Sequence, residues 1–299
     1  CKRVMDMGSS KLPDSMESRL NSILKHVFVM PSVQMGIMGN PKKLNISGDS
    51  TNVVTAANPY GKRICNCRDR GIKQCDCTRF YSDSNAAWGW DSTNECYFYG
   101  HVFHHFAACD SPFDLPLIIK PVSAKRFDGV TGVFAIKELI DLYPEFKIHA
   151  AMFDKAYDAI GFYRLLTSYH IAPVIDINKR HSQALPLPKG FDEDGYFICD
   201  AGYRMHKCGM DWSRRRHKNR CPHAVCPNKY PCDRKCSAKE YGRVVYNYID
   251  DNPRAFCPIP RDSEEWTLHY NKRTSSERLN DRIKNDFNVK NSDVRSVEA

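Results

Sequence analysis

Hydrophobic and polar residues alternate in the first part of the chain in a way that is typical of strands. The segment 44–54 reads Leu-Asn-Ile-Ser-Gly-Asp-Ser-Thr-Asn-Val-Val and places Asp49 near the middle of a predicted strand. The segment 88–105 is rich in Tyr, Phe and Val and predicts a second strand, and the short apolar run 115–121 predicts a third. Together the three segments predict the first part of a sheet.

Helical and strand periods alternate in the next part of the chain. Apolar residues recur with a helical period over 132–142 and 160–169, and apolar runs occupy 148–153 and 171–177. The run 148–153 leads directly into Asp154. Three strands, a helix, a strand, a helix and a strand predict an α/β fold with a mixed sheet and helices on both faces.

The first 40 residues are predicted to be helical. The segment 16–29 carries apolar residues at i, i+3 and i+4 positions, and Pro31 is expected to end this helix. We interpret it as a packing helix. The chain begins at Cys1 and not at Met, so residues 1–40 are expected to be the end of a truncated N-terminal region. The apolar positions of the helix are Leu20, Ile23, Leu24, Val27 and Phe28.

Residues 181–265 interrupt the α/β pattern. They contain turn-forming residues, aromatic residues, basic runs and Cys without a long helical period, and they predict a mainly β insertion. The predicted organisation is therefore a helical lead-in at 1–40, a core formed by 41–180 and 266–290, and an insertion between the two parts of the core.

A helix predicted over 271–287 returns the chain to the core and carries two stripes. At about 100° per residue, four charged or phenolic side chains fall within about 60° of one another, beside an apolar stripe. A carboxylate flanked by cations suits a site that handles a metal ion and a phosphate group together. A solvated helix with ordinary ion pairs is the alternative. The first stripe is Tyr270, Arg273, Glu277 and Lys284, and the apolar stripe is Leu279, Ile283 and Phe287.

Composition and charge narrow the class of protein. Hydrophobic residues make up 42% and charged residues 26% of the 299 positions, which is normal for a soluble globular chain. No apolar run reaches the length of about 18 residues that a membrane span needs. The formal net charge of +9 favours a polyanionic partner such as DNA.

Three short motifs together resemble a known family. The spacing Tyr-x2-Arg-x3-Glu-x6-Lys in the last predicted helix resembles the signature around the third catalytic acid of bacterial insertion-sequence DDE transposases. Ile-Ser-Gly-Asp-Ser-Thr around Asp49 and Ala-Ala-Met-Phe-Asp-Lys-Ala-Tyr-Asp around Asp154 resemble the blocks with the first two acids. The resemblance covers most of residues 20–287. It implies a ribonuclease-H-like fold with Asp49, Asp154 and Glu277 as the catalytic triad.

The resemblance also implies a chemistry. The triad would hold two Mg²⁺ or Mn²⁺ ions about 3.5–4 Å apart, with Asp49 bridging them and the other two acids each holding one. The expected steps are hydrolysis at the transposon ends and attack of the freed 3′-hydroxyl on target DNA, without a covalent enzyme intermediate. Cations of the helix would contact DNA phosphates, and the phenol would hydrogen-bond a phosphate near the cleaved bond. These DNA-binding residues are Tyr270, Arg273 and Lys284.

The implied partner is double-stranded DNA, both transposon ends and target, and a dimer on DNA is expected. The implied location is the bacterial cytoplasm in association with the nucleoid. Two rival functions remain open: a metal-dependent nuclease of the same fold without strand transfer, and a non-catalytic DNA-binding protein derived from a transposase.

Each of the first two acids also has a structural alternative. Asp49 could be a turn residue, and Asp154 could be the N-cap of the helix that follows it. Asp158 fits that cap better, because it precedes the apolar run that starts at Ala159.

Eight of the fourteen Cys residues form two clusters, which points to metal or reduced thiols and not to a disulfide scaffold. Either cluster could hold a structural Zn²⁺ with four thiolate ligands, and zinc is favoured more for the second. Reduced thiols in surface loops are the alternative. The first cluster is Cys65, Cys67, Cys75 and Cys77, and the second is Cys221, Cys226, Cys232 and Cys236.

A basic run adjoins the second cluster. We interpret it as binding the phosphate backbone of DNA, and a solvated face is the alternative. Trp212 beside the run, or Trp266, is a candidate to stack on a base flipped from the end of the element, as the resemblance implies. The predicted phosphate-binding residues are Arg214, Arg215, Arg216, Lys218 and Arg220.

Overall fold

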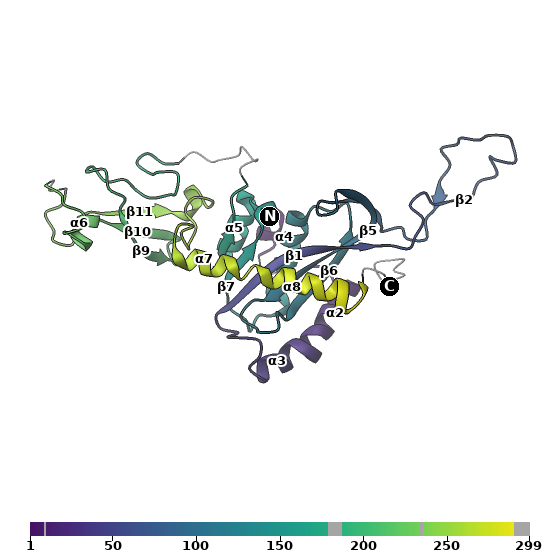
Figure 1. The fold of residues 1–299 in the computed structure, drawn as a ribbon, viewed down its shortest axis with the longest axis horizontal. Coiled ribbons are helices and arrows are strands. Elements are labelled where there is room, and N and C mark those ends of the chain that lie inside the picture. The colour runs from purple at the N-terminus through teal and green to yellow at the C-terminus, as the bar shows by residue number, and fades with distance from the viewer. Residues whose placement is uncertain (9, 179–186, 234–235, 290–299) are drawn as a thin grey trace. The chain divides into compact units, whose positions relative to one another are not determined.

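The computed structural model describes residues 1–8, 10–178, 187–233 and 236–289. Its described helices and strands form a mixed α/β fold that divides into two compact units (Figure 1). We name them the β1 unit, residues 9–146 with 274–299, and the β7 unit, residues 1–8 with 147–273. The predicted start of the insertion at residue 181 and the predicted end of the core at residue 290 lie outside the described residues. The predicted division into core and insertion stays a prediction.

The main sheet of the β1 unit is built around the long strand β5 (Cys96–Ala108). One edge of β5 pairs antiparallel with β1 (Leu44–Val54). The other edge pairs antiparallel with β4 (Ala87–Asp91) and then with β6 (Pro116–Ser123). The first and third predicted strands are therefore confirmed, and Asp49 lies opposite His105 in the register of β1 and β5.

The prediction of a single strand over 88–105 is wrong, because a turn divides this segment into β4 and β5. The carboxylate of Asp91 accepts hydrogen bonds from the backbone N–H groups of Thr93 and Asn94, at 2.9 and 3.2 Å. Glu95 then adopts a φ of 50°. An Asp that bonds to the backbone two and three residues ahead closes a turn. The Tyr and Phe residues around this turn favoured a strand and hid the Asp-Ser-Thr-Asn turn signal.

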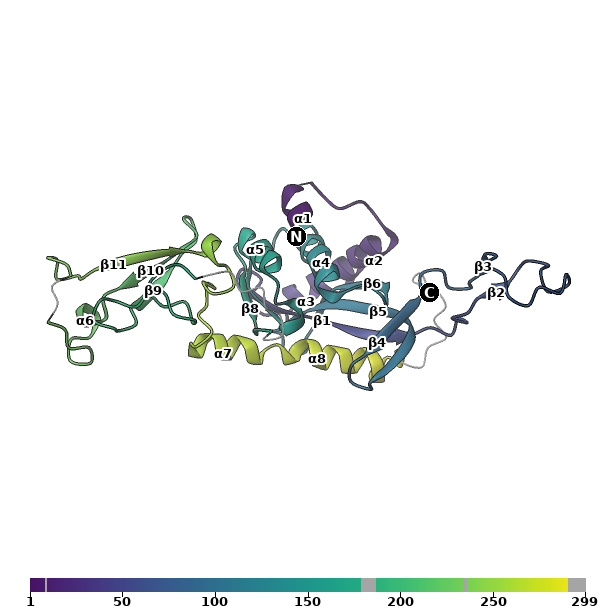
Figure 2. The same cartoon turned by 90° about the horizontal axis from the view of Figure 1, so that it is seen from above.

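Helices cover both faces of the β1-unit sheet (Figure 2). α2 (Met16–Leu24) contacts β6, and α4 (Asp128–Leu142) contacts β1, β5 and β6, which confirms the predicted helix after the third strand. α8 (Thr274–Asp281) lies on the opposite face and contacts β1 and β5. Its buried Leu279 and the following Ile283 pack against Ala107 of β5.

Residues 16–29 are helical and α2 packs against β6, which agrees with the interpretation as a packing helix, but four of the five predicted apolar positions are exposed. Leu20 is 57% exposed and Phe28 is 61% exposed. The buried side of α2 is polar: Asn21 is 3% exposed, its Nδ2 donates to the Ile119 carbonyl at 3.0 Å, and its Oδ1 accepts the Ile119 N–H at 3.0 Å. Asn21 Nδ2 also donates to Glu138 at 3.0 Å. Hydrogen bonds to β6 and α4 therefore hold α2, which the hydrophobic period alone does not show.

The prediction that Pro31 ends the first helix is also wrong. A π-helical turn at Lys25–Val29 leads from α2 directly into α3 (Met30–Gln34). Pro31 lies at the start of α3, where the missing backbone N–H of proline is tolerated.

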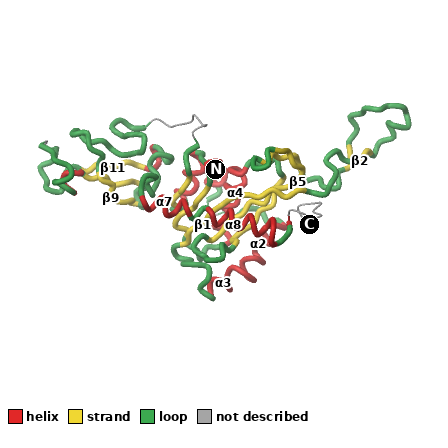
Figure 3. The backbone as a smooth tube through the Cα atoms, viewed as in Figure 1, coloured by secondary structure: helices red, strands yellow, loops and turns green. Residues whose placement is uncertain are grey.

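A long loop connects β1 to β4 in the β1 unit. Its only regular structure among the described residues is the two-stranded ladder of β2 (Lys62–Arg63) and β3 (Arg79–Phe80). Figure 3 shows that the rest of the segment between these strands is loop, and Figure 1 shows that it extends beyond the end of the sheet.

The β7 unit begins with a parallel strand pair. β7 (Ile148–Phe153) pairs with β8 (Ala172–Ile175), and α5 (Ile160–Ser168) connects them, as the sequence predicted. α1 (Lys2–Asp6) contacts α5, and α7 (Glu264–Asn271) contacts both strands. A short 3-10 helix, Lys155–Tyr157, follows β7.

Three antiparallel strands in the order β9–β10–β11 form the second sheet of the β7 unit, and they agree with the predicted β content of this region. No helix of the described residues combines the length and apolar character needed to cross a membrane. The strands are β9 (His206–Asp211), β10 (Arg216–Arg220) and β11 (Val244–Tyr248), and the short helices of this region are α6 (Pro222–Val225) and a 3-10 turn at Ile249–Asp251.

The single helix predicted over 271–287 is wrong in three respects. Helix α7 already begins at Glu264, because the Ser263 hydroxyl caps it by accepting the Trp266 N–H at 3.1 Å. A turn at 272–273 separates α7 from α8. A π-helical turn, Arg282–Asp286, follows α8 and closes with a hydrogen bond from the Phe287 N–H to the Arg282 carbonyl. This wider turn takes Phe287 off the apolar stripe, so Phe287 is 73% exposed, whereas the predicted burial of Leu279 and Ile283 is confirmed.

Candidate active site and metal centres

Asp49 lies in the middle of β1 and is half-buried, so it is not a turn residue. Its Oδ1 accepts the backbone N–H of Ser50 at 2.8 Å. Its Oδ2 accepts a hydrogen bond from Nδ2 of Asn280 on α8 at 2.9 Å. The carboxylate is therefore held from its own strand and from the helix that crosses it.

Asn280 contacts the candidate acid Asp49, and the sequence reasoning did not identify it. Its Oδ1 lies 2.6 Å from Nε2 of His105, and its Nδ2 also approaches the Ser50 carbonyl at 3.3 Å. Burial lowers the pKa of His105 to about 4, so the ring is neutral near pH 7. Because Asn280 donates to Asp49 through Nδ2, its Oδ1 is the acceptor for the His105 ring N–H. The sequence signal that could have identified Asn280 is its position, three residues after Glu277 and on the same side of the helix.

Glu277 lies on α8, one turn before Asn280, and its side chain is exposed. It lines an open hollow on the surface of the β1 unit together with charged neighbours from the helix. Two hydrogen bonds, at 2.6 and 2.8 Å, tie Arg278 to Asp114 and fix the helix beside this hollow. Lys284 follows in the π-helical turn and is half-buried.

Asp154 belongs to the β7 unit and directly follows β7. Its Oδ1 accepts the Ala156 N–H at 2.9 Å and caps the short 3-10 helix. Burial raises the pKa of Asp154 above its usual value, against the lowering effects of the Ala156 N–H and of the positive charges of Arg273 and Lys155. Asp154 is therefore a half-buried carboxylate at the end of β7 that is fixed by its bond to the backbone of the following turn.

The prediction that Asp158 caps the next helix is wrong. The N-cap of α5 is Ala159, which makes no side-chain cap. Asp158 instead accepts two hydrogen bonds from Arg254, at 2.8 and 2.5 Å, and one from the Tyr163 hydroxyl at 3.0 Å. A buried carboxylate that receives an Arg fork stabilises the β7 unit and has no cap to offer.

Tyr270 and Arg273 also belong to the β7 unit. The Arg273 guanidinium lies 5.7 Å from the centre of the Tyr270 ring, and the Trp266 ring stacks on the same Tyr270 ring, with centres 4.6 Å apart. Trp212 packs edge-on against His170, with centres 5.7 Å apart. Base stacking by either Trp stays a prediction.

The predicted basic run covers the turn between β9 and β10 and then β10 itself. Arg216, Lys218 and Arg220 alternate along β10, and the residues between them, His217 and Asn219, are buried. Three cations therefore project from one face of the strand.

Tyrosine rings accompany these cations. The Arg216 guanidinium lies 3.8 Å from the centre of the Tyr246 ring, and that of Arg220 lies 3.7 Å from the centre of the Tyr241 ring. Lys218 Nζ donates to the Tyr241 hydroxyl at 2.7 Å. We name Arg216, Lys218, Arg220, Tyr241 and Tyr246 the basic–aromatic face, a composition that is typical of surfaces that bind nucleic acids.

Arg215 differs from the other cations of the run. It binds the Asp250 carboxylate at 2.7 and 3.1 Å and donates to the Thr167 carbonyl at 2.8 Å. Its guanidinium therefore stabilises the fold of the β7 unit. Arg214 is exposed in the turn.

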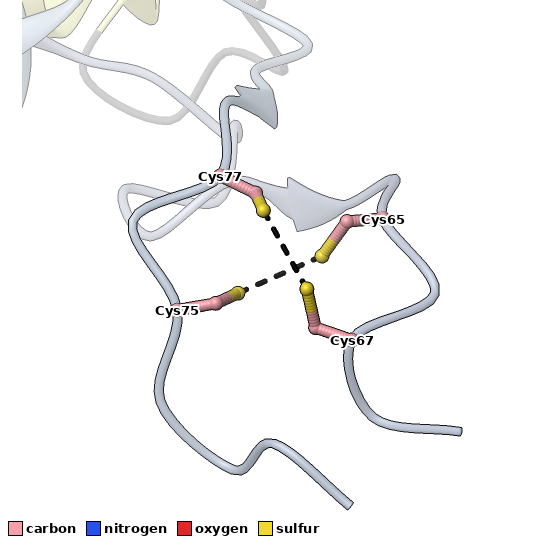
Figure 4. A group of neighbouring side chains, drawn as sticks. All are labelled: Cys65, Cys67, Cys75 and Cys77. Carbon is pink, nitrogen blue, oxygen red and sulfur yellow. Dashed lines mark hydrogen bonds between the residues drawn. The ribbon is translucent and has the colours of Figure 1, made fainter. Parts of the chain in front are cut away.

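The first cysteine cluster converges on one point in the β1 unit (Figure 4). The four Sγ atoms all lie within 4.8 Å of one another. Those of Cys65 and Cys75 are 3.6 Å apart, as are those of Cys67 and Cys77. All four are free thiols, and four cysteine ligands suit Zn²⁺.

The second cysteine cluster is only partly brought together. Cys221, Cys232 and Cys236 line one small pocket of the β7 unit, and Cys226 is not among the lining residues. Cys199 lines the same pocket, although it lies outside the spacing that the sequence singled out. Zinc at the second cluster stays a prediction.

A further donor group lies in the β7 unit. One ligand atom each from His149 of β7 and from Glu265 and His269 of α7 lies within 4.8 Å of the others. Glu265 and His269 are four residues apart on one helix, which was the signal for this group in the sequence. Of the described residues, these three and the first cysteine cluster are the groups that bring at least three such donors so close.

Comparisons with known proteins give one distant likeness. No protein-family model and no curated protein matches the sequence. Among solved structures, the chain is similar to "Cryo-EM structure of piggyBac transposase synaptic complex with hairpin DNA (SNHP)", at 12% sequence identity and a TM-score of 0.35. The match covers 91% of this chain and 48% of the other, so the chain spans about half the length of that transposase. A likeness at this level assigns neither a family nor a site.

Proposed function

We propose that the chain contains the ribonuclease-H-like catalytic core of a DDE transposase. It would cleave DNA at transposon ends and join the freed 3′-hydroxyl to target DNA. The observation that supports this most directly is the hydrogen bond between Asn280 and Asp49. It ties the helix with the third acid of the signature to the strand with the first acid. The order β1, β5, β6, α4, β7, α5 and β8 also agrees with the fold that the resemblance implies.

The proposed metal ligands are Asp49, Asp154 and Glu277, and the proposed ions are two Mg²⁺ or Mn²⁺. Carboxylate oxygens are hard ligands and fit these ions better than Zn²⁺. The fit is supported by the hydrogen-bonded, half-buried position of Asp49 and by the half-buried position of Asp154 directly after β7. Bound ions would activate the attacking water or 3′-hydroxyl and stabilise the leaving oxygen.

The side chains around the acids have separate tasks in this proposal. Asn280 orients Asp49 and is itself held by the neutral ring of His105. Arg273 and Lys284 bind DNA phosphates, and the Tyr270 hydroxyl hydrogen-bonds a phosphate next to the cleaved bond. The basic–aromatic face adds backbone contacts to double-stranded DNA, and a dimer on the DNA in the bacterial cytoplasm is part of the same proposal.

The test uses the full chain with the DNA that flanks its gene and Mn²⁺. We expect new 3′-hydroxyl ends at defined positions, followed by joined products. Asp49→Asn, Asp154→Asn and Glu277→Gln should each abolish cleavage and leave DNA binding in place. Asp281→Asn is the matched control, because Asp281 is an exposed carboxylate of α8 outside the signature.

The DNA products of this reaction also distinguish the proposed function from its two alternatives. Cleavage without joined products would favour a metal-dependent nuclease, and DNA binding without cleavage would favour a non-catalytic protein derived from a transposase. Full cleavage by any of the three triad variants would remove that residue from the site.

A further inference from the structure

The loop that carries the first cysteine cluster has little else to hold it together. We name residues 62–80 the arm. Its ladder consists of two residue pairs, Lys62 with Phe80 and Arg63 with Arg79, and an isolated two-stranded hairpin is marginal in water even when it is longer. Ile64 is 67% exposed, and none of the residues of the arm is buried. The arm therefore has no hydrophobic core of its own.

The base of the arm is anchored to the sheet. The buried carboxylate of Asp83 accepts a hydrogen bond from the Thr55 hydroxyl at 3.0 Å and lies 2.7 Å from Nε2 of the buried His101 on β5. These contacts fix the chain where it leaves β1 and where it enters β4. They do not reach the segment between β2 and β3, where backbone turns and a hydrogen bond from Arg63 to the Lys73 carbonyl hold the chain without a hydrophobic core.

The thiols provide the geometry of a metal centre. With Zn–S bonds of about 2.3 Å, the sulfur atoms of a tetrahedral site lie about 3.8 Å apart. The two measured Sγ–Sγ distances of 3.6 Å are close to this value, and far from the S–S bond of about 2.05 Å in a disulfide. The pairs cross each other, so that each Cys-x-Cys segment contributes one thiol to each pair (Figure 4).

We propose that Cys65, Cys67, Cys75 and Cys77 hold one structural Zn²⁺, and that this ion fixes the arm as an element that contacts the DNA backbone. The first half concerns the metal alone. The second half deepens the proposed function and rests on it.

The charge of the arm fits a polyanionic partner. Residues 62–80 contain six Lys or Arg and two Asp, a net charge of +4, which becomes +2 when four thiolates bind one Zn²⁺. Arg63 and Arg79 donate to backbone carbonyls at 2.8 and 2.9 Å and so hold the loop. Arg68, Arg70 and Lys73 are exposed between the two Cys-x-Cys segments. A rigid loop with exposed cations binds a polyanion such as the DNA backbone.

Metal content tests the first half. The full chain is purified under reducing conditions without added metal, and zinc is measured per folded chain in wild type and in Cys75→Ser/Cys77→Ser. We expect the double variant to lose about one Zn²⁺ per chain, and Co²⁺-loaded wild type to show a thiolate charge-transfer band that the variant lacks. Cys96→Ser, which changes an exposed cysteine of β5, and His269→Ala should leave this zinc in place.

Folding of the rest of the chain is checked by circular dichroism and by limited proteolysis. Loss of zinc should increase cleavage within the arm and leave the remaining β1 unit resistant. Equal zinc in wild type and in the folded double variant would overturn the metal site.

Salt dependence tests the second half. Arg68→Ala/Arg70→Ala/Lys73→Ala should keep the zinc and reduce the slope of log K against log salt by about 0.9 for each phosphate that the arm no longer neutralises. Lys42→Ala/Lys43→Ala is the control, since both cations are exposed in the same unit outside the arm. An unchanged slope in the zinc-loaded triple variant would refute the arm as a DNA-binding element. If the wild-type chain binds DNA but never cleaves it, the proposed catalytic function is contradicted. The effect of the arm substitutions on the salt dependence of DNA binding would still be valid.

Discussion

The role of Asn280 gives the sharpest test of the candidate active site. Asn280→Ala removes the amide that donates to Asp49 at 2.9 Å and accepts from His105 at 2.6 Å. The strand, the acids and the apolar packing of α8 all stay. The substitution therefore asks whether the position of Asp49 depends on the helix that carries Glu277.

Two hydrogen bonds set the size of the effect on stability. A buried donor left without an acceptor costs about 1–3 kcal/mol, and this applies to His105, which is buried. A hydrogen bond to a charged group is worth about 1.5–3 kcal/mol, but water replaces part of it because Asp49 is half-buried. We expect the free energy of unfolding to fall by about 2–4 kcal/mol.

The effect on activity is expected to be separate from the loss of stability. Residues that orient metal ligands typically change metal affinity or activity by about 10–100-fold when they are removed. Asn280→Ala should therefore require about 10–100-fold more Mn²⁺ for half-maximal cleavage, at a temperature where the variant is fully folded. Asn280→Asp keeps an acceptor for His105 but loses the amide donor, so its activity should fall as well.

Cleavage is followed with labelled flanking DNA over a series of Mn²⁺ concentrations, and unfolding is followed by circular dichroism. Asn285→Ala, an exposed amide later in the same helical segment, should match wild type in both assays. A folded Asn280→Ala variant with the Mn²⁺ dependence of wild type would show that Asn280 does not position Asp49.

Three further predictions concern the β7 unit. Replacing Arg216, Lys218 and Arg220 by Gln should flatten the slope of log K for DNA binding against log salt, by about 0.9 for each phosphate that no longer binds a cation. Fluorescence anisotropy measures this slope. Arg215→Gln should instead mainly lower the melting temperature. Burial lowers the pKa of His217 to about 4, from about 6.5 in the unfolded chain. Between these two pH values the unfolded state binds more protons than the folded state. The free energy of unfolding should therefore fall as the pH drops from about 6.5 to about 4. His217→Gln should lessen this fall in melting temperature, and an equal fall in the variant would contradict it. If zinc binds at the second cysteine cluster, Cys221→Ser/Cys232→Ser should release it, and comparison of Cys226→Ser with Cys199→Ser identifies the fourth ligand by zinc content.

Segments with a strong local pattern were predicted closely. The strands at 44–54 and 148–153 begin and end where the sequence placed them. Both are bounded by turn-forming residues and are largely buried, so that local preference and tertiary packing agree. Their positions also gave the setting of Asp49 and Asp154, one within a strand and one directly after a strand.

Two of the errors arose where polar side chains decided the structure. Asp91 divides an aromatic segment into a hairpin by bonding to the backbone of the turn. Asn21 reverses the expected orientation of α2 because it pairs with the backbone of β6. The hydrophobic periodicity of a sequence predicts which apolar side chains are buried. It does not predict a polar side chain that is buried because its hydrogen bonds are satisfied within the protein.

The cysteine clusters show a second limit of sequence spacing. Neither Cys-x-Cys segment alone indicates which thiols meet, because the pairs are formed across the loop. The Ile72 N–H bonds to the Cys67 carbonyl at 2.9 Å, and this turn reverses the chain so that the second segment faces the first. The number of residues between the cysteines does not show where the chain reverses its direction.

The proposed signature, Tyr270, Arg273, Glu277 and Lys284, is continuous in sequence, but its residues belong to two units of the structure. Tyr270 and Arg273 belong to the β7 unit, where the charge of Arg273 acts on Asp154. Glu277 belongs to the β1 unit, where Asn280, one turn further on, holds Asp49. Each half of the signature is therefore associated, within its own unit, with a different upstream acid.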